Sequence, residues 1–99
     1  MAKPQVRRTS EARNDLLEIL TRIGRTDPKA ATRLSAAIDD KLDLLTRFPY
    51  MGESCDEYAP QLRQFPVGNF ILFYRPVEKG IELIRAFHGA RDIPPLFGQ

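Results

Sequence analysis

Residues 62–88 have the sequence LRQFPVGNFILFYRPVEKGIELIRAFH, and this stretch decides the fold. Gly68-Asn69 is a two-residue hairpin signal, and Glu78-Lys79-Gly80 marks a second turn. The turns separate three segments with strand character, residues 62–67, 70–77 and 81–88. We therefore predict three antiparallel strands joined by short hairpins.

The three predicted strands differ in how they should be covered. Pro66 weakens the first, because proline cannot donate to a strand ladder. The second begins with the apolar run of residues 70–74, which is typical of a strand covered on both faces. Within it Phe73 and Tyr74 alternate, and core packing is expected of at least one. Alternation in the third strand places three apolar side chains on one face: Ile81, Leu83 and Phe87.

Two helices are predicted before the meander. Ser10 is the candidate N-cap of the first, and Gly24 is expected to end it. Asp27 followed by Pro28 starts the second, as a capping carboxylate before a proline at the first helical position, and Pro49 stops it. Apolar residues recur at helical spacing in both: Ala12, Leu16, Ile19, Leu20 and Ile23, then Ala31, Leu34, Ala37, Ile38, Leu42, Leu45 and Phe48. The short turn between them predicts an antiparallel hairpin.

The remaining segments complete one α+β domain over residues 1–99. Residues 6–9 are a candidate N-terminal strand of edge character, and residues 50–60 lack periodicity and are interpreted as a loop. The order is a strand, a helical hairpin and a three-stranded meander. We expect an antiparallel sheet with both helices packed on one face.

The composition is that of a globular domain, with 42% hydrophobic and 28% charged residues. Cys55 is the only cysteine, which excludes an intramolecular disulfide and a thiolate metal site. We expect no metal and no cofactor. The longest apolar run is too short to span a membrane, and the basic N-terminus leads into no apolar segment, so we expect a cytoplasmic protein.

The net charge of +2 is unevenly distributed. Acidic residues crowd the middle of the chain: Asp39, Asp40, Asp43, Glu53, Asp56 and Glu57. Basic residues dominate both ends: Lys3, Arg7, Arg8, Arg13, Arg63, Arg75, Arg85 and Arg91. If the two ends meet in one sheet, their positive charges pool on one face.

Three local signatures in this order resemble the ParE/RelE superfamily of type II toxins, and in particular its ParE-like branch of plasmid stabilisation toxins. The first is Phe48-Pro49-Tyr50-Met51-Gly52, a helix end followed by P-x-x-G. The second is Leu62-Arg63 with residues 69–75, NFILFYR. The third is residues 84–92, IRAFHGARD.

The resemblance implies a toxin neutralised by a cognate antitoxin encoded beside it. In this family the C-terminal segment of the antitoxin folds as it wraps the toxin across the helical hairpin and the sheet surface. The expected assembly is a hetero-oligomer with the antitoxin. An acidic segment binding to a basic surface suits the charge distribution of this chain.

The superfamily divides into RelE-like toxins, which cleave messenger RNA on the ribosome, and ParE-like toxins, which are associated with inhibition of DNA gyrase. RNA cleavage needs cations and a proton-transfer group. RelE-like toxins carry lysines and an arginine on the middle strands, an arginine just past the last strand, and then a tyrosine. At the positions of the lysines, the first arginine and the tyrosine this chain has Leu62, Gln64, Ile71 and Phe97, and only the late arginine is matched, by Arg91. We therefore expect a gyrase-binding toxin that is not an enzyme and does not bind nucleic acid directly. The alternatives are a RelE-type endonuclease and an inactive family member that serves only as a binding partner.

Five residues are candidates for contact with the target: Arg63, Arg75, Arg85, His88 and Arg91. A guanidinium group suits a carboxylate or phosphate through its bidentate fork. Each arginine can equally be a solvated strand residue or a member of a surface ion pair. His88 can also form local hydrogen bonds at a strand end, and the sequence proposes no nucleophile beside it.

Overall fold

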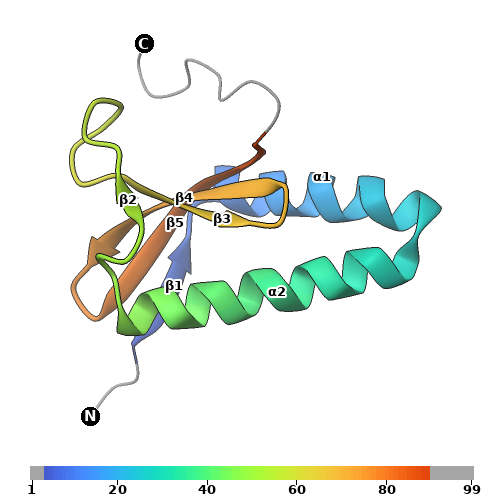
Figure 1. Cartoon of the computed structure of the whole chain (residues 1–99), viewed down its shortest axis with the longest axis horizontal. Helices are drawn as coiled ribbons and strands as arrows, with labels where there is room; N and C mark the ends of the chain where they lie inside the picture. The colour runs from blue at the N-terminus through green and yellow to red at the C-terminus, as the bar shows by residue number, and fades with distance from the viewer. Residues whose placement is uncertain (1–3, 90–99) are drawn as a thin grey trace.

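The computed structural model describes residues 4–89 as a helical hairpin on a five-stranded sheet (Figure 1). The elements in chain order are β1 (Gln5–Arg8), α1 (Ser10–Thr26), α2 (Pro28–Arg47), β2 (Glu53–Ser54), β3 (Arg63–Val67), β4 (Phe70–Val77) and β5 (Gly80–His88). The strand order across the sheet is β1-β5-β4-β3-β2. The α+β class, the helical hairpin and the antiparallel β3-β4-β5 meander are as predicted.

Two predictions about the sheet were wrong. The sheet is mixed, because β1 pairs with β5 in parallel across a crossover that contains both helices. Residues 50–60 also contain β2, in which Glu53 pairs with Gln64 and Ser54 with Arg63. Two residues are too few for any alternation to be visible in the sequence.

The helix starts follow the predicted chemistry, with one change of residue. Asp27 caps α2 as predicted, since its carboxylate accepts from the Ala30 N–H at 3.0 Å. The N-cap of α1 is Thr9 rather than Ser10. Gly24 does not end α1, because a glycine costs a helix only about 1 kcal/mol and the chain continues helical to Thr26. The prediction that Phe48 extends the apolar stripe of α2 was wrong, because α2 ends at Arg47 and the side chain of Phe48, at the C-cap, is 57% exposed. Over residues 4–89, neither helix is long and apolar enough to cross a membrane.

Both faces of the sheet are covered, as the apolar start of β4 predicts. The helices pack on one face, the helix face, over a core of buried residues: Ala12, Leu16, Ile38, Leu42, Leu45, Val67, Leu72, Tyr74, Ile81, Leu83 and Ala86. The loop between β2 and β3 covers part of the other, distal face through Cys55 and Leu62, which pack with Phe73. Phe73 and Tyr74 therefore belong to two different cores.

An irregularity in β5 reverses the predicted alternation. Tyr74 pairs with Leu83 while its neighbour Phe73 pairs with Arg85, so Ile84 is an extra residue in β5. Ile81 and Leu83 face the helices as predicted, but Phe87 lies with Ile84 in the distal cluster. The prediction that Phe87 shares their face was wrong because an inserted residue shifts every later side chain to the opposite face.

Candidate functional site

Arg63 lies at the start of β3 and organises the turn that follows α2. Its Nη1 donates to the carbonyl oxygen of Gly52 at 2.6 Å and to that of Tyr50 at 3.2 Å. The guanidinium also lies over the Tyr50 ring, 5.0 Å from its centroid. Arg63 pairs with Tyr74 and so shares its side of the sheet, the helix face.

Arg75 lies on the distal face in a row of charged side chains that crosses three strands. Glu82 of β5 is in register with Arg7 of β1 on one side and with Arg75 of β4 on the other. Arg75 donates from Nε to Oε1 of Glu82 at 3.0 Å, and its Nη2 lies 2.9 Å from the same oxygen in an ion pair. The Glu82 side chain is only 15% exposed, whereas that of Arg75 is 48% exposed. Two arginines thus flank one carboxylate on this face.

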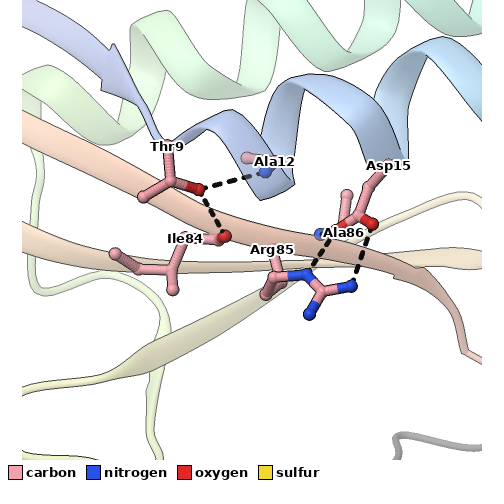
Figure 2. A network of polar contacts seen from close by, with 6 residues as sticks. All are labelled: Thr9, Ala12, Asp15, Ile84, Arg85 and Ala86. Carbon is pink, nitrogen blue, oxygen red and sulfur yellow. Dashed lines mark hydrogen bonds and ion pairs between the residues drawn. The ribbon is translucent and has the colours of Figure 1, made fainter. Parts of the chain in front are cut away.

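Arg85 is held against α1 by Asp15 (Figure 2). Its Nε and Nη2 donate to the two carboxylate oxygens at 2.7 and 3.0 Å, in a bidentate pair. Asp15 also accepts from the backbone N–H of Ala86 at 3.0 Å. The Arg85 guanidinium lies over the Phe87 ring as well, 4.7 Å from its centroid.

A second contact beside this pair fixes the start of α1. The Thr9 hydroxyl accepts from the Ala12 N–H at 3.0 Å and donates to the Ile84 carbonyl oxygen at 2.8 Å (Figure 2). Pairing of β1 with β5 ends at Arg8 and Leu83. Thr9 and Asp15 therefore supply hydrogen bonds to β5 just beyond the end of its parallel neighbour.

The last two candidates lie at the end of β5 and beyond it. The imidazole of His88 packs edge-on against Phe70, with ring centroids 5.1 Å apart and an interplanar angle of 80°. Arg91 lies outside the described residues, as does Phe97.

The candidate residues do not form one cluster. Arg63 faces the helices, while Arg75 lies on the distal face. The chain ends do meet through β1 and β5, but their positive charges pool only in part, because Arg8 forms an ion pair with Asp39 of α2 at 3.3 Å. The predicted single basic face is therefore limited to the row around Glu82, with Arg85 farther along β5.

The positions matched to the catalytic groups of RelE-like toxins hold residues of other types. Leu62 is 2% exposed and belongs to the distal core. Gln64 donates to the Glu53 carboxylate at 2.7 Å. A hollow of about 410 Å³ beside β3 is lined by one carboxylate, one amide and four apolar side chains: Glu53, Gln64, Met51, Phe65, Pro66 and Ile71.

Three groups have shifted pKa values, each with a structural cause. Burial raises the pKa of the Tyr74 phenol above 10.0, against the opposing hydrogen bond from Gly52. Burial also raises the pKa of Cys55 above 9.0, with help from the carboxylate of Glu57. The hydrogen-bonded Asp15 raises the pKa of Arg85. Among residues 4–89, no group of three His, Cys, Asp or Glu side chains is arranged to hold a metal ion.

Sequence reasoning missed the partners of the candidate arginines. Asp15 carried a signal, because it stands next to Leu16 and three residues after Ala12 on the apolar stripe of α1. A carboxylate at the margin of a buried face needs a partner. No comparable signal marks Glu82 in the sequence, since its position between Arg7 and Arg75 depends on the register of β5 with β1 and β4.

A known protein family and a solved structure resemble this chain. The family model of the ParE toxin of the type II toxin-antitoxin system parDE matches residues 6–93. A solved structure described as the chromosomal ParDE TA system from P. aeruginosa is similar in fold, with a TM-score of 0.70 and 20% sequence identity over 85% of this chain and 94% of that chain. No curated protein matches the sequence. Because the family model spans most of the chain, the protein belongs to the ParE toxin family of type II toxin-antitoxin systems.

Proposed function

We propose that this ParE-family toxin inhibits DNA gyrase by occupying a surface on it, without chemistry of its own. The observation that supports binding over RNA cleavage is the occupancy of the matched catalytic positions. Leu62, Gln64 and Ile71 supply no positive charge and no group that transfers a proton near neutral pH. Removing one preorganised charge-stabilising donor typically costs about 10²–10³ in rate, and three such positions are changed here.

The target contacts in this proposal come from the distal face and the end of β5. Arg75, Arg85 and His88 are the described candidates, and Arg91 follows them in the chain. Both strand arginines form ion pairs, and Arg75 is the more exposed of the two: 48% of its side chain is exposed, against 22% for Arg85. Guanidinium groups held by Glu82 and Asp15 are preorganised, which lowers the entropy lost when they bind a carboxylate.

A cognate antitoxin neutralises the toxin through an acidic C-terminal segment that folds on the helical hairpin and sheet. The turn end of the hairpin supports this part of the proposal. Residues 22–33 contain four basic residues and one acidic residue, a local net charge of +3. Leu17 of α1 is 67% exposed and offers an apolar contact about one and a half turns before this basic end. Both partners act in the cytoplasm, where gyrase works.

The deciding experiment adds purified toxin to DNA gyrase and to a translating ribosome system in parallel. We expect loss of supercoiling or accumulation of cleaved DNA complexes, reversed by the antitoxin, and no cuts within translated codons by primer extension. In cells, induction should cause filamentation and a DNA-damage response. Discrete codon cuts would establish the endonuclease alternative. A toxin with neither activity would be the inactive binding partner.

A further inference from the structure

The turn after α2 exposes three large apolar side chains. Phe48, Tyr50 and Met51 are 57%, 71% and 43% exposed, and we call them the aromatic tip. The Met51 N–H donates to the Phe48 carbonyl oxygen at 3.1 Å, so one tight turn carries all three. Only one other large apolar side chain in residues 4–89 is comparably exposed, Leu17 on α1. Clustered exposed apolar side chains mark interaction sites more often than single ones do.

Side chains of the sheet hold the turn of the aromatic tip in place. The buried hydroxyl of Tyr74 donates to the Pro49 carbonyl oxygen at 2.7 Å and accepts from the Gly52 N–H at 2.9 Å. Arg63 binds the carbonyl oxygens of Tyr50 and Gly52 and lies over the Tyr50 ring. Hydrogen bonds thus fix the turn on both sides of Tyr50 and Met51. A preorganised surface loses little entropy when it binds a partner.

A hollow adjoins the aromatic tip. Met51 belongs to both, and Phe65, Pro66 and Ile71 provide further apolar lining in the volume of about 410 Å³. The exposed side chains of the tip can insert into a pocket of a partner, and the hollow can receive a side chain from it. Anchor side chains buried in pockets contribute most of the binding energy at protein interfaces.

The segment that carries the aromatic tip has a negative net charge, although the whole chain has a positive one. Residues 48–67 contain three acidic residues and one basic residue, a net charge of −2, whereas the whole chain carries +2. Glu53, Asp56 and Glu57 lie close enough to Cys55 that each raises its pKa. An acidic antitoxin segment would be repelled here, while a partner with lysines and arginines around an apolar centre would be attracted.

We infer that the aromatic tip and its hollow form a further docking surface for the toxin's target protein, in addition to the arginine contacts proposed above. The target contacts this surface through apolar side chains ringed by basic residues. The inference rests on the proposed function, in that the target is the partner of an active toxin. Arg63 serves as a positioning residue for this surface. The basic hairpin turn lies at the other end of α2 (Figure 1), about 30 Å away for a helix of 20 residues, so target and antitoxin would use separate sites.

The test compares the double variant Tyr50→Ala/Met51→Ala with Leu17→Ala, which truncates the other exposed large apolar side chain of residues 4–89, on α1. The concentration of toxin that halves gyrase supercoiling should rise about tenfold or more for the tip variant and stay within about threefold for Leu17→Ala. Antitoxin affinity should show the reverse pattern. Arg63→Met should weaken inhibition through the loss of turn geometry, and Arg63→Lys should not restore it, since a lysine cannot provide the planar stacked contact.

Each result of these measurements either supports or overturns the proposed docking surface. A folded tip variant that inhibits gyrase like the wild type, or that loses antitoxin binding instead, overturns the inference and leaves the proposed function intact. If the wild type does not inhibit gyrase, the proposed function fails, and growth arrest on induction replaces supercoiling as the readout: arrest lost by the tip variant supports the docking surface, and arrest retained overturns it. A wild type without either effect overturns both. Unchanged unfolding midpoints for the tip variant confirm that it is folded.

Discussion

The phenolic hydroxyl of Tyr74 accepts a hydrogen bond from the backbone N–H of Gly52, 2.9 Å away, and so joins the middle of the sheet to the turn after α2. The same hydroxyl donates to the carbonyl oxygen of Pro49 at 2.7 Å. This explains the P-x-x-G spacing physically. One buried hydroxyl has two backbone partners three residues apart, and the second must be a residue without a side chain, since a Cβ on Gly52 would lie 2.5 Å from that oxygen.

Replacement of Tyr74 by phenylalanine should destabilise the protein by about 1–3 kcal/mol, because it leaves the Gly52 N–H and the Pro49 carbonyl oxygen without their buried partner. Denaturant unfolding of both proteins measures this difference. Tyr50→Phe is the control, since it removes a hydroxyl from a ring that is 71% exposed and keeps the aromatic face next to Arg63. Equal stabilities of Tyr74→Phe and wild type would show that water replaces the hydroxyl.

Gly52→Ala should be destabilising by about 1–3 kcal/mol for a different reason, overpacking. The added methyl would meet the Tyr74 hydroxyl at 2.5 Å and the backbone oxygen of Gln64 at 2.7 Å, and backbone cannot move aside as a flexible side chain can. Gly68→Ala is a useful comparison, because a Cβ there meets nothing within 4 Å and the cost comes only from its φ of +58°. A Gly52→Ala protein with an unchanged unfolding midpoint would contradict the close packing of this turn.

Stability should fall as the pH rises above about 9. The pKa values of Cys55 and Tyr74 are raised from 9.0 and 10.0 by burial, so at high pH the folded chain keeps protons that the unfolded chain has lost. The stability contributed by these neutral groups is fully present below the unfolded pKa and decreases as the pH rises through the folded one. Unfolding free energies measured from neutral pH to about pH 10.5 should show a smaller decline in Cys55→Ala/Tyr74→Phe. A decline of the same size in this variant would assign it to other groups.

The sequence predicted those parts of the fold that depend on local patterns. The apolar stripes gave both helices, Asp27-Pro28 gave the start of α2, and Gly68-Asn69 gave the hairpin between β3 and β4. The wrong predictions concern features that depend on contacts with a segment far away in the sequence. Thr9 is favoured over Ser10 as the cap because its hydroxyl also reaches Ile84, 75 residues away. The extra residue in β5, the parallel pairing of β1 and the two-residue β2 likewise depend on contacts far apart in the chain.

The candidate arginines could be named from the sequence, but their surroundings could not. Alternation along a strand places a side chain on a face only if the register and the bulges are known. Arg63 and Arg75 therefore look alike in the sequence, although one organises a turn on the helix face and the other pairs with Glu82 on the distal face. Their roles in target binding remain predictions for the variants proposed above.

Asp15→Ala should destabilise the protein by about 1–3 kcal/mol, because it leaves the Ala86 N–H and the guanidinium of Arg85 without their partner in a site where the two charged side chains are 14% and 22% exposed. Arg85→Met/Asp15→Ala should recover part of this loss, since the unpaired charge is gone. The matched control is Arg8→Met, which breaks the ion pair with the 63% exposed Asp39 and should cost at most about 1 kcal/mol. Unfolding free energies of the four proteins complete the comparison.

The same variants separate a structural role of Arg85 from contact with the target. If Arg85 binds the target, Arg85→Met should weaken gyrase inhibition about tenfold, while Asp15→Ala, which keeps the guanidinium, should weaken it less at a temperature where both are folded. Arg91→Ala should likewise reduce toxicity without changing the unfolding midpoint. Equal inhibition by Arg85→Met and Arg8→Met would remove Arg85 from the target surface. Its bidentate pair with Asp15 would then serve only to fasten α1 to the end of β5, where the pairing with β1 has already stopped.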